Sequence, residues 1–141
     1  MQVETILAFG GHSEAAIKFY TETLGAELIV MIRWKDSPDP ALRAVSSDPD
    51  KIMHASFRLG ETILMATDGV ETLNQPDIRG VTLNLEADDD NEAKRLFAAL
   101  SNGGKVQMPL AKTFWSSLSG MVADRFGVSW MVNVRSEEGS V

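Results

Sequence analysis

The sequence predicts an α+β fold made of two βαβββ modules, whose strands form a curved mixed sheet with the helices outside it. Two amphipathic helical segments each follow a short strand-like segment and end at a glycine. Two or three further strand-like segments follow each helix. A single shift along the chain places Phe19 on Phe97 and Gly25 on Gly103. The repeated order of elements indicates a duplicated module.

The first half is expected to begin with a strand, because an apolar segment at 3–9 ends at Gly10-Gly11. A helix of about three turns follows, with Ser13 as its predicted N-cap and Gly25 in the left-handed position after its end. The other predicted elements of this half are a strand at 27–34, a long loop and candidate flap at 37–49, and a hairpin at 52–59 and 61–67.

The second half is expected to end in a stretch at 113–133 that contains a β-hairpin and two of the three Trp. Strand-like segments at 118–123 and 128–133 flank Asp124-Arg125-Phe126-Gly127, which has the composition of a turn. In the strand at 81–86 apolar and polar residues alternate, so one face should pack on a helix. The other predicted elements are a helix from the acidic residues 88–90 to Gly103-Gly104 and a strand at 106–110.

Length and composition restrict the classes of protein. The 141 residues suit one domain, expected at 1–136 with modules at about 1–70 and 80–135 and a flexible tail at 137–141. A net charge of −7 disfavours nucleic acid and anionic membranes as partners. The sequence shows no membrane span or secretory signal, so we expect a cytoplasmic protein. The absence of Cys excludes disulfides, thiolate metal sites and Cys nucleophiles.

His54 is the predicted catalytic residue. Strand alternation places it on the same side as Ser56 and opposite Ala55. On a concave face, its imidazole could exchange a proton with a ligand near neutral pH. The alternative is a His whose hydrogen bonds are satisfied by a neighbouring strand or loop. His12, before the first helix, is expected to be a surface or capping residue.

Aromatic and polar side chains supply further candidates. Trp115, near a loop, is expected to form a wall for a planar ligand, whereas Trp130 should face a helix. Asp124 is interpreted as a turn former, with a general base as the alternative. The predicted ligand-binding residues, which are equally consistent with a solvated cleft, are Thr5, Ser56, Met65, Thr82, Asn84, Trp115, Met131 and Asn133.

One stretch of the second half carries a family resemblance. Its residues are Phe114-Trp115, Gly120, Asp124, Phe126-Gly127, Trp130-Met131 and Asn133. Weaker matches precede it in order, at Ala15, Phe19-Tyr20, Leu24-Gly25-Ala26, Met53-His54-Ala55 and Leu64-Met65-Ala66. This pattern resembles the PhnB-like branch of the glyoxalase/bleomycin-resistance (vicinal oxygen chelate) superfamily, a branch also labelled demethylubiquinone methyltransferase-like. The resemblance implies the paired βαβββ fold.

The resemblance also raises the question of a metal, because the superfamily commonly holds a divalent ion with His and Glu ligands. The usual ligand positions fall near Thr5, Met65, Thr82 and Met131. None of these is a His or a carboxylate, which such ions require. With two His in the chain, a site with three imidazoles cannot form. We therefore predict no metal and no cofactor.

Methyl transfer is not expected, despite the family label. A nucleotide-like methyl donor usually needs a glycine-rich turn from strand to helix on a doubly wound sheet. The sequence has no such loop, and it has no Gly-x-Ser-x-Gly elbow for a nucleophilic Ser.

The leading hypothesis is a small-molecule binding protein, or a metal-independent enzyme of unknown reaction. A homodimer is expected, because exposed sheet edges are usually completed by a second chain. One alternative is a metal-dependent lyase, isomerase or dioxygenase of the same superfamily that uses His54 with acids from the connectors. The other is an antibiotic-sequestering resistance protein in which Trp115 stacks on a flat compound.

Overall fold

The computed structural model describes residues 1–136, so the predicted tail at 137–141 lies outside the described residues. The chain divides into two compact units, the first from Met1 to Ile78 and the second from Arg79 onward. Each unit contains one of the predicted βαβββ modules, which confirms the α+β class. The strands form two four-stranded mixed sheets, one in each unit.

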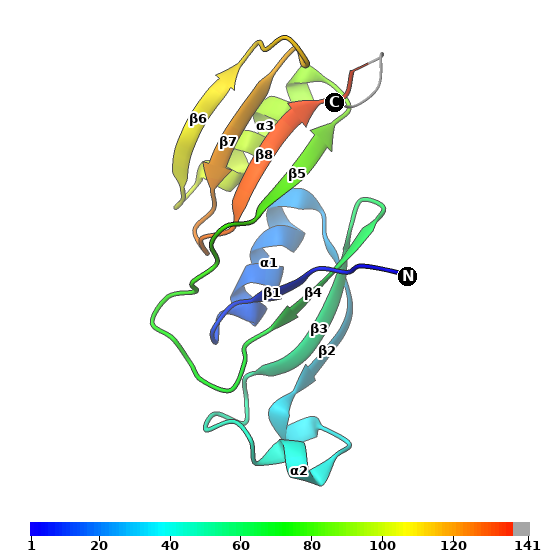
Figure 1. Ribbon diagram of the computed structural model, residues 1–141, viewed down its shortest axis with the longest axis vertical. Helices are drawn as coiled ribbons and strands as arrows, with labels where there is room; N and C mark the ends of the chain where they lie inside the picture. The colour runs from blue at the N-terminus through cyan, green and yellow to red at the C-terminus, as the bar shows by residue number, and fades with distance from the viewer. Residues whose placement is uncertain (137–141) are drawn as a thin grey trace. The chain divides into compact units, whose positions relative to one another are not determined.

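The first unit consists of β1 (Ile6–Ala8), α1 (Ser13–Leu24), β2 (Glu27–Arg33), β3 (Ile52–Leu59) and β4 (Thr62–Thr67). Its sheet has the order β1-β4-β3-β2, in which β1 runs parallel to β4 and the other pairs are antiparallel (Figure 1). The segment predicted as a plain loop contains a short helix, α2 (Pro40–Arg43), after a 3-10 turn at Trp34–Asp36. The Asp39 carboxylate accepts a hydrogen bond from Ala41 N and begins α2.

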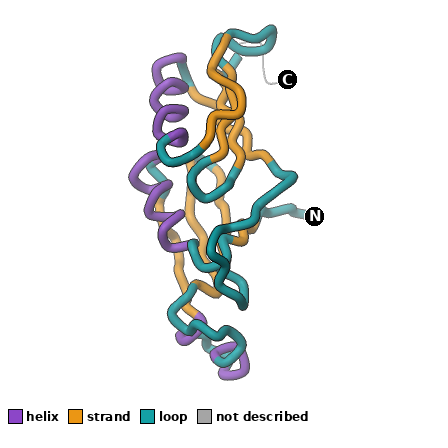
Figure 2. The backbone as a smooth tube through the Cα atoms, turned by 90° about the vertical axis from the view of Figure 1, so that its left-hand side faces the viewer, coloured by secondary structure: helices purple, strands orange, loops and turns teal. Residues whose placement is uncertain are grey.

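The second unit repeats this arrangement with β5 (Thr82–Ala87), α3 (Asp90–Ser101), β6 (Lys105–Ala111), β7 (Ser119–Ala123) and β8 (Ser129–Val134). Its sheet order, β5-β8-β7-β6, is the order of the first unit strand for strand, including the parallel pair β5 and β8. Figure 2 shows α1 and α3 each on one side of the strands of its own unit. Each sheet therefore has a helix-covered face and an opposite face, which we call its open face.

The core of each unit lies between its helix and its sheet. In the first unit Phe9, Tyr20 and Phe57 are fully buried, and the rings of Tyr20 and Phe57 stack at 6.0 Å between centroids. In the second, α3 buries Leu96 and Leu100 against the helix-covered face of the sheet. Trp130, predicted to face a helix, is buried together with Val128 and Val132.

The start of α1 corrects one prediction. His12, not Ser13, occupies the N-cap position, and no side chain of the helix start caps it. The buried Asp68, just after β4, takes this role: its Oδ1 accepts hydrogen bonds from Gly11 N and Ser13 N. Its Oδ2 accepts from Ile52 N at the start of β3. One carboxylate thus joins the helix to two strands, and a negative charge at a helix N-terminus is favourable.

The interpretation of Asp124 as a turn former is confirmed. Its Oδ1 accepts hydrogen bonds from Phe126 N at 2.9 Å and Val128 N at 3.1 Å, and its Oδ2 accepts from Trp130 Nε1 at 2.9 Å. Gly127 closes the turn with φ 84°, a conformation that favours glycine. Among the described residues, no helix is long and apolar enough to cross a membrane.

Candidate functional site

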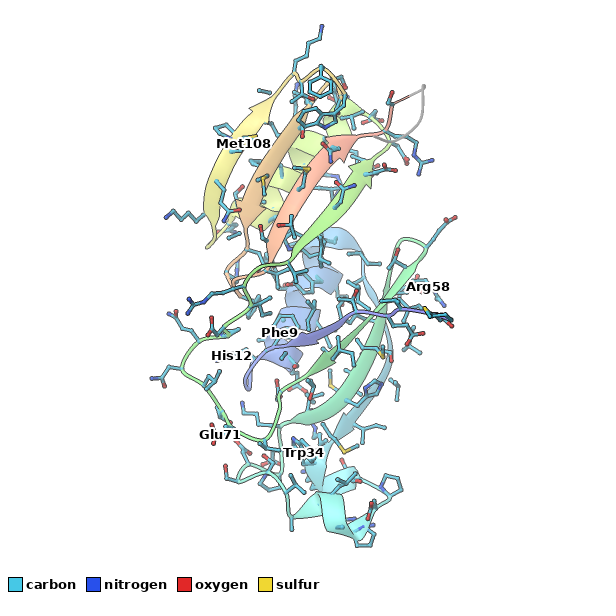
Figure 3. All side chains as sticks on the ribbon, in the orientation of Figure 1. Phe9, His12, Trp34, Arg58, Glu71 and Met108 are labelled. Atoms are coloured by element: carbon cyan, nitrogen blue, oxygen red, sulfur yellow. The ribbon has the colours of Figure 1, made fainter. Side chains whose placement is uncertain are left out.

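The open face of the second sheet gathers most of the predicted ligand-binding residues. Cross-strand partners share a face of a sheet, so the register defines which side chains lie together. Met108 of β6 pairs with Met121 of β7, Met121 pairs with Met131 of β8, and Met131 pairs with Asn84 of β5. Three thioethers and one amide therefore form a row across all four strands, with Met108 at its outer end (Figure 3). We call this the methionine row.

Asn133 is the centre of a hydrogen-bond network beside the methionine row. Its Oδ1 accepts hydrogen bonds from Trp115 Nε1, at 3.0 Å, and from the hydroxyl of Ser119. Its Nδ2 donates to Oδ1 of Asn84. Ser119 is buried and Asn133 is 8% exposed, so the centre of the network is shielded from water, whereas Trp115 is half-buried and Asn84 is exposed. Such shielding strengthens each bond and fixes the positions of the amides.

The network determines how Trp115 and Asn84 can act on a ligand. The indole N–H of Trp115 donates to Asn133, which fixes one edge of the half-buried ring. Phe114 meets Trp115 edge to face at 4.8 Å between centroids. Asn84 is exposed and keeps its amide N–H groups as donors. The methionine row adds a polarizable surface, which suits aromatic or otherwise apolar ligands.

A second row of hydroxyl and amide groups lies beyond the methionine row. Thr82 pairs with Ser129 in the register, and the Thr82 hydroxyl donates to Ser129 Oγ at 3.4 Å. Ser129 Oγ donates to Gln107 Oε1 at 3.1 Å. This end of the open face is more polar and more exposed than the Asn133 end.

The open face of the first sheet carries the other predicted residues. Ser56 pairs with Val30 on one side and with Met65 on the other, and Met65 pairs with Ile6. His54 lies on the same face, as predicted, because its Nε2 is 3.2 Å from Ser56 Oγ. This face is otherwise mostly aliphatic, in contrast to the amide network of the second unit.

Thr5 does not join either group. It precedes β1, and its carbonyl accepts a hydrogen bond from Met65 N at 3.0 Å. Strand alternation places its side chain on the side of the buried Leu7, toward the helix-covered face. The residue beside Met65 on the open face is Ile6.

Sequence reasoning missed Ser119, Met121 and Met108. The pattern at 118–123 predicts a strand, but it does not distinguish the two faces of that strand. The register of the hairpin, in which Met121 lies opposite Met131, would have identified the open-face residues once the turn at Asp124 was fixed.

The four positions at which the family resemblance implies metal ligands carry no side chain that suits a divalent ion. Thr5 and Thr82 offer hydroxyls, and Met65 and Met131 offer thioethers. Neither group replaces the imidazole and carboxylate donors of such sites. Across residues 1–136, no group of three or more His, Asp or Glu is placed to hold a metal ion.

Comparison with known families identifies the branch. A family model described as 3-demethylubiquinone-9 3-methyltransferase matches residues 1–133. The chain belongs to this family. It is also 33% identical to Protein YjdN of Escherichia coli (strain K12), with 98% of each chain covered.

Solved structures agree with this family. Protein PA1353 from Pseudomonas aeruginosa is 42% identical with a TM-score of 0.82, covering 95% of this chain and 97% of its own. A putative 3-demethylubiquinone-9 3-methyltransferase, PhnB protein, from Bacillus cereus is 26% identical with a TM-score of 0.77. The match covers 95% of this chain and 99% of the Bacillus cereus chain. A glyoxylase/bleomycin resistance protein/dioxygenase domain from Frankia sp. EAN1pec, 14% identical with a TM-score of 0.62, covers 97% and 93% and shows the shared fold.

Proposed function

We propose that this protein binds a small molecule on the open face of its second sheet, without the metal centre of the superfamily. The observation that carries the proposal is the network around Asn133, which holds Trp115 and Asn84 at the edge of the methionine row. Fixed polar groups beside an apolar surface are typical of small-molecule sites. The metal-free part rests on the donor set at the usual ligand positions.

Binding is favoured over methyl transfer by the architecture. Both sheets in the described part of the chain are mostly antiparallel, with one parallel pair each. Sites for nucleotide-like donors usually lie at the carboxyl ends of parallel strands in a doubly wound sheet. The family's description alone therefore does not assign this reaction to the chain.

The test uses protein labelled with ¹³C at the methionine methyls, which report on the row directly. A panel of small aromatic amides and carboxylic acids is added while the methyl signals are recorded. A binder on this face shifts the signals of Met108, Met121 and Met131, whereas Met31 in the first unit serves as an internal control. Shifts confined to other methionines, or none with any compound, would contradict the proposal.

Variants then test the residues. For a compound that binds, Asn84→Ala and Trp115→Phe should each weaken Kd about tenfold, which corresponds to about 1.4 kcal/mol. Asn74→Ala, an exposed amide in the connector of the first unit, is the matched control and should leave Kd unchanged. Equal affinity in all three variants would place the ligand elsewhere.

We further propose that the protein is a cytoplasmic homodimer. Leu28 and Ile29 of the edge strand β2 are 51% and 47% exposed, and an apolar edge strand is a surface that proteins usually cover. Light scattering at micromolar concentration should give twice the chain mass of 15.4 kDa. A monomer mass would contradict the homodimer.

A further inference from the structure

Ser56 and His54 form a hydrogen-bonded pair on the open face of the first sheet. The distance from Ser56 Oγ to His54 Nε2 is 3.2 Å, and both side chains are half-buried. They are two residues apart on β3, so strand geometry places them on one side. The pairing of β3 with β2 and β4 holds its backbone from both sides.

We propose that Ser56 and His54 are a nucleophile and general base that cleave small apolar carboxylic esters. This site lies in the first unit, and the proposal is independent of ligand binding on the second sheet. A Ser hydroxyl is a weak nucleophile unless an adjacent base within about 2.6–3.2 Å can take its proton. In the imidazole tautomer with its proton on Nδ1, the Nε2 lone pair accepts the Ser56 hydroxyl proton.

The reaction balances with water as its co-reactant. Ser56 Oγ forms a bond to the ester carbonyl carbon while its proton passes to His54 Nε2. The ester C–O bond then breaks, and the leaving alkoxide takes that proton. Water attacks the resulting acyl-serine, again losing a proton to His54, and the acid leaves as Ser56 Oγ recovers the proton.

The neighbours of the pair indicate the class of ester. Val30 and Met65 flank Ser56 on the adjacent strands, and Ile6 lies beyond Met65. Val30 is 37% exposed and Ile6 is 58% exposed, so an apolar acyl group can lie against them.

Strand alternation places Arg58, which is labelled in Figure 3, on the same side of β3 as Ser56, where it adds a positive charge. Its NH1 is 3.6 Å from Glu27 Oε2, and both side chains are substantially exposed. This loose pair leaves Arg58 as a cation two residues from Ser56. Arg58 therefore adds to the positive potential on this side of the strand, which favours substrates of negative or polarised character.

The first experiment uses the full chain and a fluorophosphonate probe. Ser56 Oγ would bond to phosphorus as fluoride leaves and the hydroxyl proton passes to His54. Intact mass should show one adduct, and peptide mapping should place it on Ser56. Ser56→Ala and His54→Gln should each lose the adduct, while Ser47→Ala, which removes an exposed hydroxyl from a loop of the same unit, should keep it.

Hydrolysis of p-nitrophenyl butyrate is measured with the same variants. Loss of the nucleophile or base should lower kcat/KM about 10²-fold, within the range for general base catalysis. A second comparison does not depend on loss of activity, which misfolding could also cause. The thiol of Ser56→Cys should react with iodoacetamide faster when His54 is present than in the double variant Ser56→Cys, His54→Gln. An adduct away from Ser56, no adduct at all, or equal alkylation rates would each overturn the proposal.

Discussion

The two units share one topology but carry different chemistry on their open faces. Strand order, parallel closing pair and helix position are the same in both. The second unit places a shielded amide network and three methionines on its open face, whereas the first places a Ser–His pair among aliphatic side chains. The backbone pairing thus determines which positions face the open side of each sheet, whereas the residue types at those positions differ between the two units.

The two units also differ in how each uses its buried carboxylate. Asp68 joins the start of α1 to the start of β3, far apart in sequence, whereas Asp124 organises a turn and holds the nearby Trp130. The same chemical group therefore makes long-range contacts in one unit and local contacts in the other.

The largest expected effect is from Asp68→Ala. The change leaves the N–H groups of Gly11, Ser13 and Ile52 without their acceptor, at roughly 1 kcal/mol or more each. We expect the free energy of unfolding to fall by about 3 kcal/mol, measured by urea denaturation. Glu61→Ala, at an exposed turn of the same unit, should change it by less than about 0.5 kcal/mol. Similar losses in both variants would mean that Asp68 does not link helix and strand.

The residues after the two helices provide a matched pair. Ala26 is buried in the first unit, and the equivalent residue of the second is Gly104. A Cβ at Gly104 would lie 2.3 Å from the carbonyl oxygen of Ala123. Gly104→Ala should therefore destabilise by about 3 kcal/mol, and Ala26→Gly by about 1 kcal/mol. Thermal unfolding of both variants tests this, and a neutral Gly104→Ala would show that the two connections are equally spacious.

The two open faces should respond unequally to loss of a polar group. Asn133→Ala removes the shared partner of Trp115, Ser119 and Asn84, and should lower the free energy of unfolding by about 2 kcal/mol. Ser56→Ala, in a half-buried pair, should cost less than about 1 kcal/mol. Urea denaturation measures both. Equal losses would contradict the contrast between a shared structural network and a half-buried pair.

The smallest expected effect is at the ion pair of Lys35 and Asp50, 2.8 Å apart on the surface of the first unit. The hydrogen bond from Lys35 lowers the pKa of Asp50, and the same bond raises the pKa of Lys35. The contribution of ionised Asp50 to the stability of the fold is fully present above its ordinary pKa of 3.8. It is lost as the pH falls through the lowered pKa. The contribution of protonated Lys35 to the stability of the fold is fully present below its ordinary pKa of 10.5. It is lost as the pH rises through the raised pKa.

Stability at neutral pH should therefore hardly change in Asp50→Asn, because both groups are exposed and screened by water. The small difference in Tm between Asp50→Asn and the parent protein should disappear in 1 M NaCl, and also at acid pH, where Asp50 is protonated. Asp36→Asn, which removes a more distant carboxylate, is the control. A large difference that persists in salt would show that the pair is shielded.

The sequence alone predicts those elements whose determining interactions are local. The structure confirms the predicted helix that ends at Gly25 and the predicted turn from Asp124 to Gly127. Capping of α1 could not be predicted, because its acceptor is Asp68, more than fifty residues away.

Met131 and Asn133 are among the predicted ligand-binding residues, but the sequence does not reveal which residues of other strands lie beside them. Those depend on the register between strands, which also brings Met121 beside Met131 and Ser119 opposite Asn133. The network at the candidate site is thus a product of strand pairing rather than of any short motif.

The parallel closing pair has a consequence for the order in which each unit is assembled. β1 is made first, yet its partner β4 lies about sixty residues later in the chain, so their contact closes a long loop. The hairpin of β3 and β4 closes a short one and can form early. During synthesis the first strand must therefore remain unpaired until its unit is almost fully made, and its docking completes each sheet.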